Sequence, residues 1–419
     1  MKKKTKNALL LVGMVVLAGI VFFTVYFFVM REPEGETQPS TIKEISLEIG
    51  AGNIESGNGD ESTSEEIQEE SGEEESTEAP EENTLPEISK EVRGIYVTGP
   101  KAGSEGFADL VTLVDETELN TMVIDIKDDN GNITFKSDAE FLSAEGTCIG
   151  YIRDIDGMMS LLKEKNIYTI ARIACFKDDT LANNRPDLAL KTPDGTYVTD
   201  ANGLKWVNPH SEEVWDYLCS IGELAHEKGF DEIQFDYVRF PVGETASKAD
   251  YGVDTATVTH EDGINGFLSY AEERFHAEGI LFGADLFGTV MGSDADKDTT
   301  GQDYAAIAET VDVVCPMVYP SHYANGSFGQ KVPDAAPYET IKGAMDLSVE
   351  QLSGSAPETV ADVRPWLQCF TAKWVNGYVP YGKEQIEAQI KAVYDSGYTQ
   401  WILWNATNRY DVREVNMLP

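Results

Sequence analysis

The sequence lacks the residue patterns that usually bind metals, phosphates or nucleic acids. Its five histidines have no metal-ligand spacing, and no glycine-rich phosphate loop follows the first predicted strand. The five cysteines are odd in number and contain no C-x-x-C pair, which argues against a disulfide framework or a zinc site. The 32 basic residues face 73 acidic ones, and this balance disfavours binding to nucleic acid. We therefore expect no cofactor and no metal site.

The first 30 residues have the composition of a membrane anchor. Four lysines within Met1–Lys6 precede the uncharged, apolar segment Ala8–Met30, which is long enough to cross a bilayer as a helix. The lysines should remain in the cytoplasm. We expect a transmembrane signal anchor over 1–30, with a cleaved signal sequence as the alternative. Either form exports the rest of the chain, so the predicted location is the cell membrane, single-pass, with the remainder extracellular.

Residues 31–90 are predicted to form a disordered acidic linker. They contain 19 acidic and three basic residues and almost no aromatic ones. Such a segment buries too little apolar surface to fold, and its charge extends it. Its function would be to hold the following domain away from the membrane.

Residues 91–419 are predicted to form an α/β domain, a (β/α)₈ TIM barrel. Eight β-rich segments alternate with amphipathic helices, which is typical of this barrel. A doubly wound open sheet is the alternative. The predicted strands are 94–98, 121–127, 168–176, 232–240, 281–288, 311–319, 363–370 and 399–405.

The connections from strand to helix are long, whereas those from helix to strand are short. In a barrel the long connections gather on one face, the one that carries the active site. Aromatic residues are frequent there and suit a sugar, which has apolar C–H faces between its hydroxyls. These residues are Trp206, Tyr251, His322, Tyr323, Trp374 and Tyr378.

Alternation within the strands predicts which charged residues face the barrel axis. Asp125 and Lys127 alternate with Ile124 and Ile126, so the two charged residues should point inward. The same pattern places Arg172, Asp236 and Asp285 inside. Charges in a barrel lumen need partners, and both signs are present.

Two carboxylates that flank a glycosidic bond suffice for its hydrolysis. We assign Asp236 as the nucleophilic or stabilising carboxylate and Asp285 as the acid/base, although the two roles could be inverted. Whether the reaction retains or inverts the anomeric configuration, and which sugar it cleaves, stay open. The expected substrate-binding residues are Asp125, Lys127, Arg172, Trp206, Asn208, Tyr237, Arg239, Tyr319, His322 and Trp404.

Several motifs resemble a bacterial family of glycoside hydrolase-like domains of unknown function, over roughly residues 91 to 410. They are the segments 93–98 (RGIYVT), 123–128 (VIDIKD), 170–173 (IARI), 206–209 (WVNP) and 235–241 (FDYVRFP). The resemblance implies an exported or membrane-anchored barrel of the glycosidase clan. It implies no particular substrate.

The chain is also similar to α-amylase-type barrels, which place a nucleophilic aspartate at the end of strand four and an acid at the end of strand five. Asp236 and Asp285 match these places. Gln234 departs from the pattern, because those barrels have an arginine there, and their acid is usually a glutamate. Asp125 is therefore a reserve candidate for the acid. A chitinase-like arrangement is a weaker match, because Val238 stands where the terminal glutamate would be.

The predicted function is a membrane-anchored extracellular glycoside hydrolase that cleaves a cell-wall or extracellular polysaccharide. The alternative is a non-catalytic carbohydrate-binding barrel attached to the cell surface. A metal-dependent hydrolase is a weaker third possibility. Of these, only the glycoside hydrolase needs two carboxylates at a catalytic spacing, which is about 5 Å for retention or about 6.5–9.5 Å for inversion.

Overall fold

The computed structural model describes residues 85–89, 91–356 and 360–419. The predicted anchor, 1–30, and nearly all of the predicted linker, 31–90, lie outside these residues. Within the described ranges, no helix is long and apolar enough to cross a membrane.

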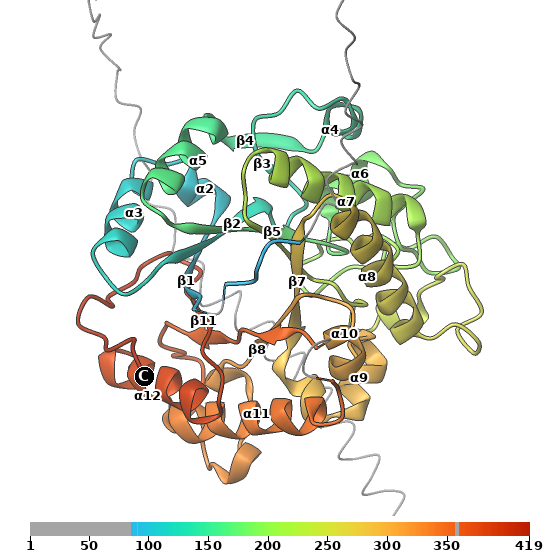
Figure 1. Cartoon of the computed structure of the whole chain (residues 1–419). Helices are drawn as coiled ribbons and strands as arrows, with labels where there is room; N and C mark the ends of the chain where they lie inside the picture. The colour runs from blue at the N-terminus through green and yellow to red at the C-terminus, as the bar shows by residue number, and fades with distance from the viewer. Residues whose placement is uncertain (1–84, 90, 357–359) are drawn as a thin grey trace, which may run out of the picture. The chain divides into compact units, whose positions relative to one another are not determined.

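Eight parallel strands form a closed barrel, which confirms the predicted fold of the domain (Figure 1). Each strand pairs with its neighbours in the order β1-β11-β10-β8-β7-β6-β5-β2, and the pairing of β1 with β2 closes the ring. The strands are β1 (Arg93–Val97), β2 (Thr121–Lys127), β5 (Tyr168–Ala174), β6 (Glu232–Asp236), β7 (Leu281–Phe287), β8 (Val313–Met317), β10 (Trp366–Gln368) and β11 (Trp401–Trp404).

Helices surround this barrel, as Figure 1 shows. They are α2 (Gly99–Ala102), α3 (Phe107–Asp115), α4 (Glu140–Glu145), α5 (Ile155–Glu164), α6 (Asp179–Asn184), α7 (Glu212–Glu227), α8 (His260–Ala277), α9 (Asp294–Thr300), α10 (Tyr304–Ala308), α11 (Pro337–Leu352) and α12 (Lys383–Asp395). Short 3₁₀ turns lie in the long loops: η1 (Ala246–Lys248), η2 (Gly288–Gly292), η3 (Pro320–His322), η4 (Ser327–Gly329) and η5 (Pro333–Ala335).

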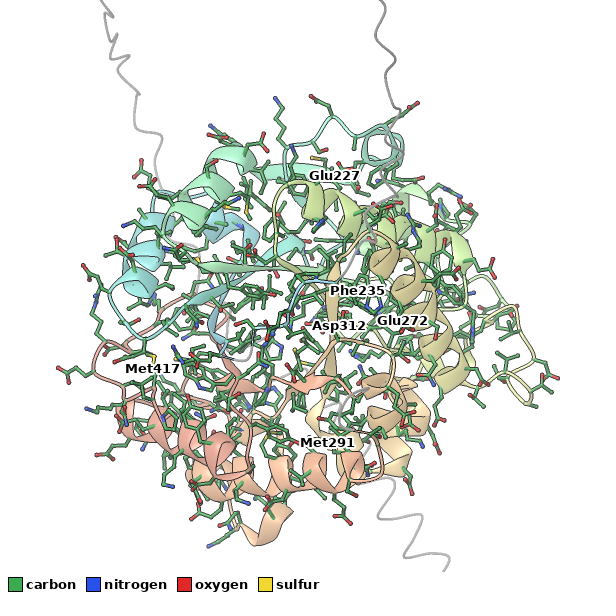
Figure 2. All side chains as sticks on the ribbon, viewed as in Figure 1. Glu227, Phe235, Glu272, Met291, Asp312 and Met417 are labelled. Atoms are coloured by element: carbon green, nitrogen blue, oxygen red, sulfur yellow. The ribbon has the colours of Figure 1, made fainter. Side chains whose placement is uncertain are left out.

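The apolar face of the strands packs against the helices. Phe235 on β6 contacts Phe267 and Phe275 of α8, with ring centroids 5.1 and 5.7 Å apart (Figure 2). The glycines that follow α7, α8 and α12 all have positive φ, between 73° and 96°. Glycine adopts this left-handed conformation without a steric cost, so it ends each helix and redirects the chain into the next strand.

The opposite face of the strands fills the barrel lumen. Near the amino ends of the strands, Arg364 and Glu232 form a fully buried ion pair, 2.7 Å apart. Apolar residues pack in the lumen, among them Val123, Ile170 and Val313. The lumen is therefore a packed core, and the polar side chains described below lie toward the carboxyl ends of the strands.

The structure also contains strands that sequence patterns did not indicate. β3 (Ile133–Phe135) runs antiparallel to β2, and β4 (Cys148–Ile152) pairs with β3. The predicted strand 363–370 is divided into β10 and the short β9 (Asp362–Val363), which pairs with β8. Since β3 returns directly from the end of β2, the chain makes a tight turn over 128–132, beside the barrel mouth.

Candidate active site

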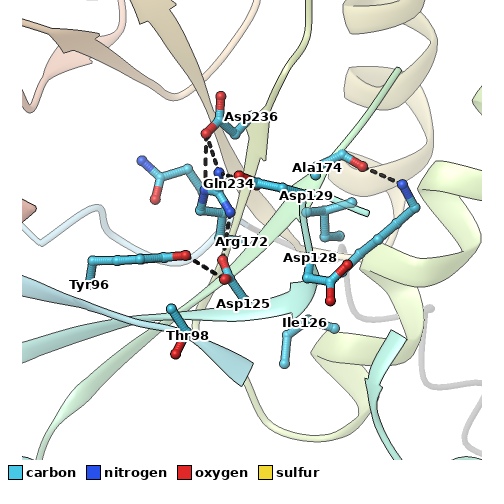
Figure 3. A network of polar contacts seen from close by, with 12 residues as sticks. Tyr96, Thr98, Asp125, Ile126, Asp128, Asp129, Arg172, Ala174, Gln234 and Asp236 are labelled. Carbon is cyan, nitrogen blue, oxygen red and sulfur yellow. Dashed lines mark hydrogen bonds and ion pairs between the residues drawn. The ribbon is translucent and has the colours of Figure 1, made fainter. Parts of the chain in front are cut away.

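Arg172 is the centre of a buried acidic cluster at the carboxyl ends of β2, β5, β6 and β7 (Figure 3). Its guanidinium donates to Asp236 Oδ2 through Nε at 3.0 Å and Nη2 at 2.5 Å. Nη1 donates to Asp125 Oδ1 at 2.6 Å, and Nη2 also donates to Asp129 Oδ1 at 3.0 Å. Asp285 Oδ2 lies 4.0 Å from Nε. One cation thus faces four carboxyl groups.

The strand register explains this convergence. Asp125 pairs with Arg172, which pairs with Gln234, so the three side chains lie at one level of the barrel. Phe235 pairs with Ala284, and one step further along both strands come Asp236 and Asp285. These two carboxylates therefore lie at the same height on neighbouring strands, as the alternation within the strands predicts.

Asp236 and Asp285 are close enough to act on one bond. Asp236 Oδ2 lies 3.0 Å and Asp285 Oδ2 lies 4.0 Å from the same nitrogen, Arg172 Nε, so these oxygens are at most 7.0 Å apart. Both face the lumen rather than the helices, because Asp285 Oδ1 accepts from Trp366 Nε1 at 2.6 Å and from Gln234 Nε2 at 2.7 Å. This upper limit is compatible with the spacing of a carboxylate pair that flanks one bond.

The two carboxyl groups differ in environment. The side chain of Asp236 is 11 % exposed, and its Oδ1 also accepts from the backbone N–H of Tyr237 at 2.5 Å. Asp285 is only 1 % exposed, and its Oδ2 has no hydrogen-bond partner in the part of the chain that the structure describes. Burial, together with the negative charge of Asp236, raises the pKa of Asp285 well above its ordinary value. Burial thus favours the protonated form of Asp285.

Asp125 has a similar but weaker perturbation. Burial raises its pKa to about 7, against the opposing effect of Arg172. Its Oδ2 accepts from the hydroxyl of Tyr96 at 2.5 Å. With Arg172 as the main counter-charge, like-charge repulsion prevents all four carboxyl groups from ionising together.

Asp129 and Tyr96 were not among the site residues proposed from the sequence. Asp129 lies in the turn after β2, its side chain is 44 % exposed, and its Oδ2 accepts from Tyr237 Oη at 3.3 Å. The acidic run Asp128-Asp129 directly after a strand was an available signal. Nothing in the sequence pattern of β1 pointed to a polar contact for Tyr96.

Lys127 was predicted to bind substrate, but the structure places it elsewhere. It is fully buried, lies 2.8 Å from Asp178 Oδ2, and donates to the carbonyl of Ala174. The pairing of β2 with β5 shifts register between Asp125 and Lys127, so the lysine leaves the phase of the inward-facing residues. Asp178 in turn caps α6 by accepting from the N–H of Leu181. The pair fixes the loops around the mouth instead.

Asn208 is also outside the cluster. Its Nδ2 donates to the carbonyl of Tyr251 at 2.9 Å, and its Oδ1 accepts from the N–H of His210. Both contacts are within or between loops. Asn208 lines a separate surface pocket with residues 187–193, Asp250 and Gly252 of the neighbouring loops. Its role in the structure is to anchor one loop on another.

Aromatic residues form the wall opposite the acidic cluster. Tyr319 lies with its ring centroid 5.5 Å from that of Trp404 and 5.1 Å from that of His322, so these three predicted residues are brought together. Phe370 packs against Trp404 at 5.3 Å. Tyr96 connects the aromatic wall with the acidic cluster, since its ring stacks on Trp404 while its hydroxyl donates to Asp125.

Trp206, Tyr237 and Arg239 form a third group beside Asp236. The guanidinium of Arg239 lies 4.8 Å from the ring centroid of Trp206 and 5.5 Å from that of Tyr237. Tyr237 has a φ of 50°, a conformation that is strained for a residue with a side chain. This turn lets Asp236 face the lumen while the ring of Tyr237 lies among the loops.

The fold and the cluster of carboxylates define a TIM-barrel protein of the glycoside hydrolase type. The chain belongs to the family described as "putative glycosyl hydrolase domain", whose model matches residues 94–410. This finding confirms the family resemblance seen in the sequence motifs. No functionally curated protein matches the chain.

Solved structures similar to this chain include the following two. A hypothetical protein from Ruminiclostridium thermocellum is 36 % identical, with 46 % of this chain and 96 % of that chain covered and a TM-score of 0.42. The PgaB (BpsB) glycoside hydrolase domain from Bordetella bronchiseptica is 12 % identical, with 78 % and 99 % covered and a TM-score of 0.53. At that identity, the likeness to PgaB supports the fold alone.

Proposed function

We propose that the protein is a membrane-anchored extracellular glycoside hydrolase that cleaves a cell-wall or extracellular polysaccharide. The observation that carries this proposal is the asymmetric pair at Arg172. Asp236 accepts two hydrogen bonds from the guanidinium, whereas one oxygen of Asp285 has no hydrogen-bond partner among the described residues and burial raises the pKa of Asp285. Hydrolysis of an acetal needs one carboxylate and one carboxylic acid, and this pair supplies both.

In the proposed reaction, Asp285 gives its proton to the leaving glycosidic oxygen while Asp236 attacks the anomeric carbon. Water then hydrolyses the glycosyl ester, and the carboxylate of Asp285 takes the proton of that water. The limit of 7.0 Å between the two oxygens includes the spacing of retaining enzymes, about 5–5.5 Å, and excludes most of the inverting range of about 6.5–9.5 Å, so we assign retention.

Asp129 is the competing candidate for the acid. Arg172 Nη2 donates to Asp129 Oδ1 at 3.0 Å and to Asp236 Oδ2 at 2.5 Å, so these two carboxylate oxygens are at most 5.5 Å apart. The side chain of Asp129 is also more exposed than that of Asp285. However, although burial raises the pKa of Asp129, Arg172 and Lys177 outweigh burial and hold it below its ordinary value. An ionised group has no proton to donate, so we assign the acid to Asp285.

The aromatic wall favours a sugar as the ligand. Trp404 is half-buried and packs on the buried rings of Tyr319 and Phe370, on the side of the barrel opposite the carboxylates. Sugar rings place C–H groups on such surfaces while their hydroxyls bind polar groups. The apolar segment Ala8–Met30 and the acidic segment after it support attachment of the barrel to the outer side of the membrane.

The test is the release of reducing ends by the purified full-length chain from a panel of polysaccharides and wall fragments. We expect activity on at least one, lost in Asp236→Asn while the fold is retained. Polysaccharide binding without any release of reducing ends would instead support the non-catalytic carbohydrate-binding barrel.

A further inference from the structure

Arg239 is a buried cation without an anionic partner. It is 3 % exposed, and Nη1 donates to the carbonyl of Phe240 at 2.9 Å. Within the described residues, no carboxylate lies within ion-pair distance of its guanidinium, and no acceptor receives its other N–H groups. The other two buried arginines differ, because Arg172 and Arg364 each contact carboxylates.

This arrangement is costly unless a ligand completes it. A guanidinium carries five N–H donors, and burying a charge without a counter-ion costs several kcal/mol. The rings of Phe287, Trp206 and Tyr237 lie 4.7, 4.8 and 5.5 Å from the guanidinium carbon, and cation–π contacts offset part of that cost. They provide no acceptor for the N–H groups. Burial accordingly lowers the pKa of Arg239.

A second unpartnered donor lies in the same place. The indole Nε1 of Trp206 is buried and has no hydrogen-bond partner among the described residues. Buried donors in folded proteins nearly always have an acceptor, so each exception calls for an explanation. Here the exception is the indole N–H of a side chain in direct contact with the guanidinium of Arg239, and an anion beside both would accept from the indole and face the charge of the guanidinium.

The neighbouring lysine does not need such a ligand. Lys177 lies 3.4 Å from Asp200 Oδ2 and 4.7 Å from the ring centroid of Tyr237. Its charge is therefore compensated within the protein. Arg239 follows Asp236 by three residues on the loop that ends β6, so an anion at Arg239 would belong to a sugar unit next to the reacting one.

We propose that Arg239 and the indole N–H of Trp206 bind the carboxylate of an acidic sugar unit in the substrate. A planar carboxylate matches the fork of N–H donors of a guanidinium. This inference rests on the proposed function and specifies its substrate class.

The test compares two ligands that differ only in the carboxylate. Methyl glucuronide and methyl glucoside, each as both anomers, are titrated into the full-length chain by calorimetry. Charge-assisted hydrogen bonds should make the glucuronide bind at least about tenfold more tightly. Arg239→Met should reduce this preference to within about twofold, and Arg239→Lys should keep part of it. Arg153→Met, at an exposed arginine, should leave the preference unchanged.

The inference is wrong if the wild-type chain binds neither glycoside, binds both equally, or keeps its preference in Arg239→Met. The wild-type comparison is decisive even if a variant unfolds, which near-ultraviolet circular dichroism would reveal. Binding needs no turnover, so the two proposals fail separately. An Arg239-dependent preference without hydrolysis refutes the hydrolase alone, whereas hydrolysis without any preference refutes the anion subsite alone.

Discussion

Replacement of Asp285 by asparagine tests the division of catalytic roles most directly. Asparagine has the same shape, and its carbonyl oxygen can still accept from Gln234 and Trp366 as Asp285 Oδ1 does. Because burial raises the pKa of Asp285 and so favours its neutral form, the change replaces one neutral group by another and leaves the hydrogen bonds between Arg172 and Asp236 in place. It removes only the transferable proton.

The expected loss follows from the role of that proton. General acid catalysis contributes about 10²–10⁴-fold, so kcat on a polysaccharide should fall by this factor, or about 3–5 kcal/mol in activation free energy. A nitrophenyl leaving group needs no proton, so kcat for nitrophenyl glycosides of the cleaved sugar should fall less than about tenfold in the glycosylation step. Asp129→Asn is the matched control and should retain activity on both substrates.

The pH profile gives an independent check. The acid must be protonated, so wild-type kcat/KM should fall as pH rises through the raised pKa of Asp285, and the variant should lack this limb. The stability of the wild type should also fall as pH rises. At pH values between the ordinary carboxyl pKa, near 4, and the raised pKa of folded Asp285, the unfolded chain has released a proton that the folded chain keeps. The free energy of unfolding of the wild type therefore decreases as pH rises through this interval. Asp285→Asn should therefore be as stable as the wild type or more stable at pH 7, as measured by urea unfolding. Equal losses on both substrates, or loss of activity in Asp129→Asn instead, would refute the assignment.

Three further predictions concern other parts of the chain. The pKa of Asp125 is raised from 3.8 to about 7, so the wild type should lose up to about 4 kcal/mol of unfolding free energy between pH 4 and pH 7. The Asp125→Asn variant should lack this loss when its unfolding by urea is measured over the same pH range. Parallel curves of unfolding free energy against pH for the two proteins would contradict the prediction. Lys127→Met leaves Asp178 buried without its partner and should lower the unfolding free energy by about 3–5 kcal/mol. The double variant Lys127→Met with Asp178→Leu should recover part of this loss. A change in unfolding free energy below about 1 kcal/mol in Lys127→Met would show that the pair has little effect. Deletion of residues 2–30 should shift the protein from the membrane fraction to the soluble one, and continued sedimentation with membranes would refute the anchor.

The sequence was sufficient to predict the barrel and the direction of its main polar side chains. Alternation of apolar and charged residues in β2, β5 and β6 indicated that Asp125, Arg172 and Asp236 face the lumen, and the structure places them there. Glycines after α7, α8 and α12 marked the helix ends correctly. These features depend on local backbone periodicity and on the conformations that single residues can adopt, so they can be read from a short window of sequence.

Register and loop packing decided the rest. Arg172 and Asp236 are 64 residues apart in the chain, and Trp366 and Asp285 are 81 apart, so no local pattern indicates that they meet.

A shift in the pairing of β2 withdrew Lys127 from the mouth, and the tight turn before β3 brought Asp129 to Arg172. The sequence determined which side of each strand a charge occupies. Only the tertiary structure decided which charges neutralise one another, which carboxyl group keeps its proton and why Arg239 is left without a counter-ion. The physical reason is that these properties depend on distance and burial, which segments far apart in the sequence create together.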